Sequence, residues 1–179
     1  MKKVGIKQVV EELKKSKIVR SFKPASLAEV EAHERMLAVR FSPVFTEFLT
    51  TFGVLEIYER TVFGLGPAIR PHETRSLMFH TLYARSDATV KLPPHLVVIW
   101  HDSHSDYQCL DTSQIQRGDC PIVYFDNEIA RSRSPKPTHV ADGFHDWLRM
   151  RVDSELKIKA DWDAYVASKK RAPKPRKKT

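Results

Sequence analysis

Apolar side chains recur every three or four residues in the first third of the chain, which is the spacing of helices with one buried face. In "SLAEVEAHERML", Ser26 and Glu29 form a capping box, and a helix is expected to about Ala38. In "FSPVFTEFLTTFG", Ser42 suits the N-cap of a second helix and Gly53 its C-cap. The phenylalanines of this second helix form a wide apolar face, which indicates a helix at the centre of the core.

Short apolar runs in the middle of the chain predict strands. These runs are "VLEIYE", "TVFGLG", "HLVVIW", "DYQCLD" and "PIVYFD". Between the second and third runs, residues 72–86 have a helical composition. Its buried side is expected to consist of Leu77, Met78, Thr81 and Leu82.

Two helices are expected after the strands. "ADGFHDWLRMRVDSEL" has Asp142 as its N-cap and turns Phe144 and Trp147 inward, and a last short helix surrounds Trp162 and Tyr165. Helices first, strands in the middle and helices last indicate an α+β fold. We expect one antiparallel sheet, a meander, packed against the helices.

The net charge of +8 is unevenly distributed along the chain. Residues 1–23 carry eight basic and two acidic side chains, and residues 169–179 carry seven basic and no acidic ones. The domain between them, residues 24–168, has a net charge of −5. The first segment is predicted to be a basic amphipathic helix, and the last a disordered tail, because lysine and proline cannot form a core. The apolar stripe of the first segment consists of Ile6, Val9, Val10 and Leu13.

The sequence also argues against several classes of protein. No apolar run reaches the roughly 18 residues that cross a bilayer, and the basic N-terminus lacks the features of a signal peptide. Two cysteines, Cys109 and Cys120, are too few for a disulfide framework, although they could pair across a hairpin. A reduced, cytoplasmic protein is therefore expected. No phosphate-binding or dinucleotide motif occurs, so no cofactor is expected.

Four consecutive pieces of the chain follow a known order. They are "SLAEVEAHERMLAV", "FSPVFTEFLTTFG", "VIWHDSHSDYQCLDTSQIQRGDCPIVYFDNE" and "VADGFHDWLR". In order and spacing they resemble the SUKH superfamily, also known as the SMI/KNR family, over about Ser26 to Arg149. Ser42 and Gly143 depart from the family pattern, which has leucine and serine there. The resemblance implies a bacterial immunity protein that binds and neutralises a polymorphic toxin, often a nuclease or a deaminase. Some eukaryotic relatives act instead as regulatory or scaffold proteins.

Aspartates and histidines in the strand region raise the question of chemistry. "HDSHSD" contains His101, Asp102, His104 and Asp106, which could bind a metal. Together with the serines of this stretch, they could also form the catalytic site of a hydrolase. Zinc needs three or four converging ligands, and neither a paired CxxC nor a nucleophile elbow occurs. A polar turn is therefore the favoured interpretation, and neither catalytic nor metal-binding residues are expected. Further aspartates are expected at strand or turn ends, where a carboxylate accepts turn N–H groups. They are Asp111, Asp119 and Asp126.

Negative charge on the domain fits the immunity hypothesis. A nuclease needs a basic surface to hold phosphates, and an inhibitor that covers this surface gains association rate and specificity from negative charge. Acidic and tyrosine side chains of two hairpins are the candidate partner contacts: Glu56, Tyr58, Glu59, Asp102, Asp106 and Tyr107. A solvated sheet edge is the alternative for each.

The basic tail supports a second hypothesis, an interaction or regulatory module that is not an antitoxin. Its cations could hold a nucleic-acid backbone weakly and without sequence preference. Sequence-specific recognition is not expected, because no aromatic residues are interleaved with the lysines for base stacking. The candidate contacts are Lys169, Lys170, Arg171, Lys174, Arg176, Lys177 and Lys178. A solvated tail that binds nothing is the alternative.

Overall fold

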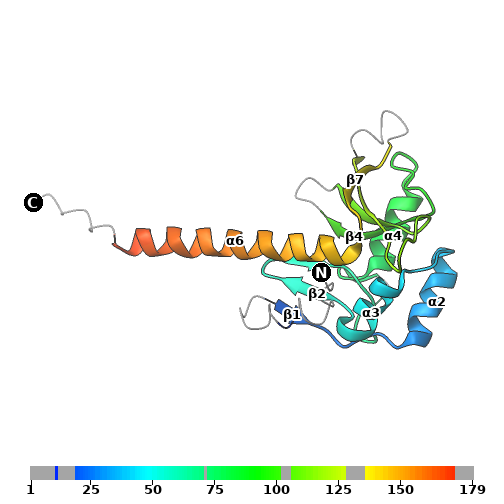
Figure 1. Cartoon of the computed structure of the whole chain (residues 1–179), viewed down its shortest axis with the longest axis horizontal. Helices are drawn as coiled ribbons and strands as arrows, with labels where there is room; N and C mark the ends of the chain where they lie inside the picture. The colour runs from blue at the N-terminus through cyan, green and yellow to red at the C-terminus, as the bar shows by residue number, and fades with distance from the viewer. Residues whose placement is uncertain (1–10, 12–18, 71, 102–105, 128–135, 172–179) are drawn as a thin grey trace, which may run out of the picture.

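The structure is a computed structural model that describes residue 11 and residues 19–70, 72–101, 106–127 and 136–171. Its elements confirm the expected α+β class (Figure 1). In chain order they are β1 (Val19–Ser21), α2 (Leu27–Leu37), α3 (Pro43–Phe52), β2 (Leu55–Ile57), β3 (Arg60–Val62), α4 (Leu77–Ser86), β4 (Leu96–His101), β5 (Tyr107–Asp111), β6 (Ile122–Phe125), β7 (Thr138–Ala141) and α6 (Phe144–Arg171). The helix expected near the N-terminus lies outside the described residues, apart from Glu11, which is helical.

The strands form two antiparallel sheets, where a single meander was expected. One sheet has the order β1-β2-β3 and the other the order β4-β5-β6-β7, so each is a meander by itself. The sheets meet just after β3, where the backbone N–H of Phe63 donates to the carbonyl of Ile99 in β4 at 2.8 Å. The periodicity of a run marks it as a strand but does not specify its neighbour, because strand pairing is not a local property.

The sequence did not predict two of the strands. Val19–Ser21, expected as the end of the first helix, forms β1 by pairing antiparallel with β2. Thr138–Ala141, expected as part of a loop, forms β7 beside β6. Both strands lie at a sheet edge and are mostly exposed, so neither shows the alternation of apolar and polar residues that marks a half-buried strand.

The ends of the first two described helices are confirmed. Ser26 caps α2, with its hydroxyl accepting from the Glu29 N–H at 3.2 Å while Glu29 Oε2 accepts from the Ser26 N–H at 2.7 Å. Ser42 caps α3 by accepting from the Phe45 N–H at 3.2 Å. At the other end of α3, Gly53 has a φ of 66°, a conformation that glycine adopts without strain. Local rules therefore position both helices.

Helix α3 lies at the centre of the core, as expected. Phe45 and Phe48 are fully buried, and the rings of both lie within about 5 Å of the Phe144 ring at the start of α6, at 4.9 and 5.0 Å. The Trp147 ring then contacts the Trp100 ring of β4, with centroids 5.8 Å apart. These aromatic contacts join α3, α6 and the second sheet into one core.

Helix α4 begins at Leu77, capped by Ser76, and not at residue 72. Leu77, Met78 and Thr81 are buried as expected, but Leu82 is exposed and His80 is buried instead. The His80 ring stacks on Phe63, with centroids 3.9 Å apart. The helix therefore presents a slightly rotated face to the core, and a stacked imidazole takes the place that an apolar side chain was expected to fill.

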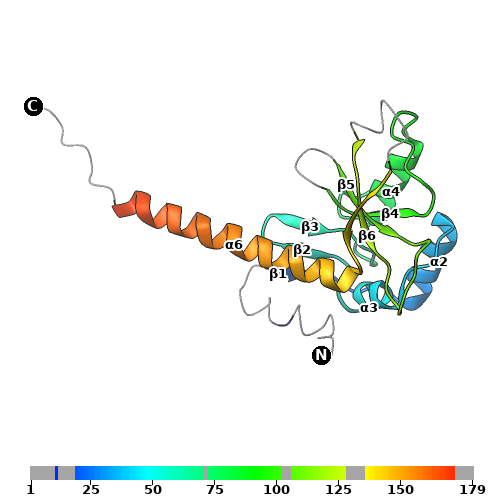
Figure 2. The same cartoon turned by 45° about the horizontal axis from the view of Figure 1, so that its top comes forward.

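Helix α6 is one continuous helix of 28 residues, and the expectation of two separate helices is wrong. Its first turns pack against α3 and the second sheet, and the rest extends away from the body (Figures 1 and 2). It ends at Arg171, so the first three residues of the expected tail are helical. Across the described part of the chain, every helix is too short or too polar to span a membrane.

Candidate partner-binding surface

The β2–β3 hairpin presents three of the predicted contact residues. Glu56 is partly exposed and lies 3.8 Å from both Arg20 and Arg75, so its charge is shared with two cations. Tyr58 begins the turn with a φ of 54°, and its side chain is partly buried against the core. Glu59 follows it and is exposed. This hairpin thus presents the exposed Glu59 carboxylate and part of the Tyr58 side chain at the surface.

The second predicted group is not at the surface. Asp106 and Tyr107 are buried: Tyr107 begins β5, in which all five residues are buried, and Asp106 directly precedes this strand. The Asp106 carboxylate accepts from the Asn127 N–H at 2.9 Å and from the Tyr124 hydroxyl. Asp106 therefore links the start of β5 to β6 and to Asn127. Because both side chains are buried, the prediction that Asp106 and Tyr107 contact a partner directly is wrong. Asp102 lies outside the described residues.

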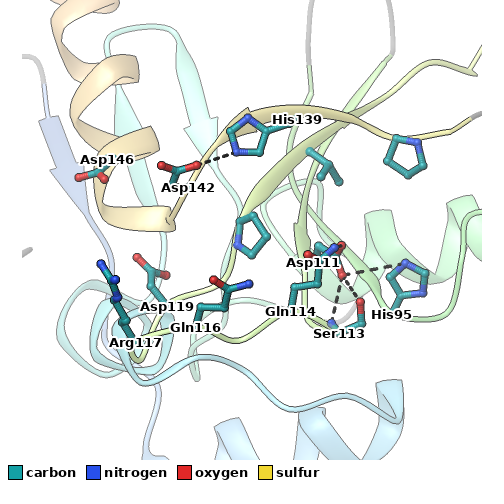
Figure 3. Close-up of a pocket in the computed structure, with 13 residues that line it drawn as sticks. His95, Asp111, Ser113, Gln114, Gln116, Arg117, Asp119, His139, Asp142 and Asp146 are labelled. Atoms are coloured by element: carbon teal, nitrogen blue, oxygen red, sulfur yellow. Dashed lines mark hydrogen bonds and ion pairs between the residues drawn. The ribbon is translucent and has the colours of Figure 1, made fainter.

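A groove of about 960 Å³ lies where the β5–β6 connection faces β7 and the first turn of α6 (Figure 3). The sequence did not indicate it, because its walls come from segments far apart in the chain. Most of its lining is polar: His95, Asp111, Ser113, Gln114, Gln116, Arg117, Asp119, Pro121, Val123, Pro137, His139, Asp142 and Asp146.

Two buried carboxylates on the groove wall organise the backbone around it. Asp111 accepts from the Ser113 N–H at 3.1 Å and from the Gln114 amide at 2.7 Å, which confirms its expected role at a strand end. Asp119 accepts from the Cys120 N–H at 2.9 Å and from the His145 N–H at 3.2 Å. Asp119 therefore links the β5–β6 turn to the first turn of α6.

Gly143 stands in close contact with the same carboxylate. A Cβ at this position would collide with Asp119 Oδ2. The departure from the serine of the family pattern is thus explained by close packing between the turn and the start of α6. Glycine allows the buried carboxylate to reach the helix N-terminus.

The rim of the groove carries exposed negative charge. The Asp142 side chain is 93% exposed and accepts from His139 Nε2 at 2.9 Å. Asp146 is half-exposed beside His145 Nδ1, also at 2.9 Å. Arg117 is the basic residue among the lining side chains. With neutral histidines, the lining is therefore net acidic and suited to a cationic surface.

The arrangement of groups in the groove does not match a hydrolase. Ser113 donates to Asp111, and His95 Nε2 lies 4.0 Å from the same carboxylate (Figure 3). In a catalytic triad the imidazole lies between the hydroxyl and the carboxylate, whereas here the carboxylate lies between the other two. Among the described residues, no three histidine, cysteine or acidic side chains are grouped to hold a metal ion.

The fold and the order of its motifs agree with a known family. The family model SUKH_5, described as SMI1-KNR4 cell-wall, matches residues 6–153. The chain belongs to this family. A search of curated proteins finds no match. The SUKH domain thus includes both sheets and the packed half of α6, which confirms the resemblance drawn from the motifs.

The SUKH match covers only the first part of α6. It begins within the basic N-terminal segment and stops at residue 153, about a third of the way along α6. The half of α6 that projects from the body therefore lies beyond the part that the family model describes. The SUKH family is not known for enzymatic activity.

Proposed function

We propose that the protein is a bacterial immunity protein that acts in the cytoplasm by binding a cognate toxin and blocking it stoichiometrically. The observation that carries the proposal is the SUKH family match over residues 6–153. The arrangement in the groove supports a binding role, since Asp111 and Asp119 hold turns and the His95 imidazole lies beside Asp111, not beside the Ser113 hydroxyl. Blockade by binding requires one inhibitor per toxin and no turnover.

Electrostatics favour a toxin with a basic active-site surface, such as a nuclease. Residues 24–168 carry a net charge of −5. Asp142 and Asp146 place part of this charge at the groove rim, and Glu56, Tyr58 and Glu59 extend the candidate surface to the β2–β3 hairpin. A negative surface facing a phosphate-binding site attracts the toxin at long range and excludes its substrate.

Co-expression with the toxin encoded by the neighbouring gene tests the function. Growth should be rescued, and the two proteins should co-purify with one copy of each. Failure of both rescue and co-purification would contradict the proposed function.

Charge reversal tests the surface separately. The double variant Asp142→Lys/Asp146→Lys should lower the association rate about tenfold at low salt, because exposed charges act mainly on the rate of encounter. The matched control is Glu31→Lys/Glu47→Lys, which reverses two exposed acidic residues of α2 and α3 outside the groove. If both variants rescue growth and associate with the toxin at equal rates, the proposed function stands but the groove is excluded as the contact surface.

The projecting basic end of α6 favours a second candidate function, weak contact with nucleic acid. Lys169 is exposed near the end of a helix that extends away from the acidic body (Figure 1). The other candidate contacts follow it, four of them, from Lys174 to Lys178, outside the described residues. Deleting residues 169–179 should abolish retention on heparin or RNA at moderate salt. Unchanged retention would exclude this function for the tail.

A further inference from the structure

The face of α6 that packs on the body continues beyond it as an apolar stripe. Trp147, Val152 and Glu155 are buried against the domain. Steps of three and four residues along the same face lead next to Ile158, Trp162 and Tyr165.

These last side chains are 49%, 54% and 52% exposed: Ile158, Trp162 and Tyr165. Lys169 Nζ lies over the Tyr165 ring, 5.4 Å from its centroid, and the described residues leave about half of each of these side chains exposed. The rings of Trp162 and Tyr165 contact each other, with centroids 5.7 Å apart. Two aromatic rings and an isoleucine on one helix face are a surface of the kind that proteins bury against another element.

The chain enters the first sheet beside the point where α6 leaves the body. Val19, at the start of β1, pairs with Ile57 at the end of β2 (Figure 2). Glu59 and Arg60, at the β2–β3 turn, lie near Glu155 of α6: burial raises the pKa of Glu155, Arg60 lowers it and Glu59 raises it. Residues 1–18 therefore connect to the body next to the base of the uncovered stripe.

The sequence of residues 1–18 complements this stripe. Ile6, Val9, Val10 and Leu13 recur with helical spacing, and Glu11, on the opposite side of such a helix, is helical and exposed. A helix of 18 residues is about 27 Å long, and α6 from Glu155 to Arg171 spans about 26 Å at the same rise per residue. The two stretches match in length as well as in pattern.

We propose that residues 1–18 form an amphipathic helix that packs antiparallel on the projecting half of α6 and covers Ile158, Trp162 and Tyr165. The direction follows from the connection, because α6 runs away from the body while the N-terminal segment must run back to Val19. The pair extends the SUKH domain into a two-helix arm. Its contact continues the interface that already holds the first half of α6.

The effect of salt distinguishes residues 1–18 from a nucleic acid as the group that covers the apolar stripe of α6. Residues 1–18 carry six lysines and two glutamates, and α6 from Lys157 to Arg171 carries five basic and two acidic side chains. Two basic helices repel each other, so apolar burial must hold them together, and added salt should preserve or strengthen the contact. Nucleic acid on the same face would instead dissociate as salt is raised.

Acrylamide quenching of tryptophan fluorescence in the full chain tests the proposal. Trp100 and Trp147 are buried, so Trp162 dominates the quenchable emission. The variant Val9→Asp/Leu13→Asp should raise the quenching constant about twofold or more, because charged side chains on the apolar face prevent the segment from packing on Trp162. The Trp162 ring, which is 54% exposed on α6, then becomes accessible to acrylamide. The control Gln8→Asp places one added negative charge on the opposite helix face and should leave quenching unchanged. Unquenched emission from Trp100 and Trp147 verifies that the core of each variant is folded.

Three results would overturn the proposal. Equal quenching of the wild type and the double variant would show that the segment does not cover Trp162. Protection that disappears on dilution would assign the cover to a second copy of the chain. Protection that is lost in about 1 M salt, where charges are screened beyond roughly 3 Å, would assign it to a bound polyanion.

Discussion

The indole N–H of Trp147 donates to the side-chain oxygen of Gln108 at 2.6 Å, deep inside the protein. The Arg151 guanidinium donates to the same oxygen at 2.9 Å. One buried amide of β5 therefore accepts from two successive turns of α6. This contact fixes the helix against the second sheet and so determines the direction in which its free half extends.

Replacing this amide should destabilise the protein. Gln108→Leu leaves the buried indole N–H without its acceptor, and we expect the free energy of unfolding to fall by about 1–3 kcal/mol. Urea denaturation followed by circular dichroism measures the change. Gln116→Leu, an exposed glutamine of the groove, should change stability by less than about 0.5 kcal/mol. Equal effects of the two substitutions would contradict the role of Gln108.

Asp119 should matter more for stability than its exposed neighbour. Asp119→Ala removes the acceptor of the Cys120 and His145 backbone N–H groups and of the Ser42 hydroxyl, and should cost about 2 kcal/mol or more. Asp142→Ala, at the solvent-exposed rim, should cost less than about 0.5 kcal/mol. Thermal melts of both variants provide the comparison, and a reversed order would exclude the linking role of Asp119.

His101 should make the stability of the protein depend on pH. Burial, together with the neighbouring His80 imidazole, lowers the pKa of His101 to about 4. Between about pH 6.5 and pH 4 the unfolded chain binds a proton that the folded ring resists, so the free energy of unfolding should fall as the pH is lowered through this window. The full shift corresponds to about 3 kcal/mol, and partial exposure of the ring reduces the expected loss to about 1–2 kcal/mol.

The variant His101→Phe isolates this contribution. It keeps the aromatic contacts with Phe63 and Tyr107 and removes the titrating group. Its stability should fall less than that of the wild type over the same pH range. His72→Phe, which replaces an exposed imidazole, should follow the wild type. Parallel curves for all three proteins would assign the pH dependence to other groups.

Both cysteines should be unreactive in the folded protein. They are free and buried, burial raises the pKa of the Cys109 thiol strongly, and burial raises the pKa of Cys120 to about 11. Because the thiolate is the reactive form, neither should react with a disulfide reagent near neutral pH. Both should react after denaturation in urea. Rapid labelling of one thiol under native conditions would show that its strand opens readily.

The sequence predicted those features that depend on neighbouring residues. The caps of α2 and α3 follow from Ser26, Glu29 and Ser42, because these side chains bond to backbone groups only three residues away. Each strand of the second sheet except β7 also follows from a short apolar run. These elements could be predicted from the sequence because propensity, capping and periodicity act within a few residues.

Features that depend on distant segments were missed. Asp106 was placed at the surface because its polarity suggests exposure, whereas Asn127 and Tyr124 supply the hydrogen bonds that allow its burial. The groove joins the β5–β6 turn, β7 and the start of α6, and no local pattern marks such a meeting. The continuity of α6 was missed because its second half is mostly polar and lacks the burial that makes a helix easy to recognise.

The length of α6 has a practical consequence for binding measurements. A helix of 28 residues is about 42 Å long, and it begins at the acidic groove and ends at Arg171. A chip surface or fluorophore coupled at the C-terminal side is thereby held far from the groove. Immobilisation through that end should leave Asp142 and Asp146 accessible to an analyte. Random coupling through lysine amines would instead attach the protein in many orientations.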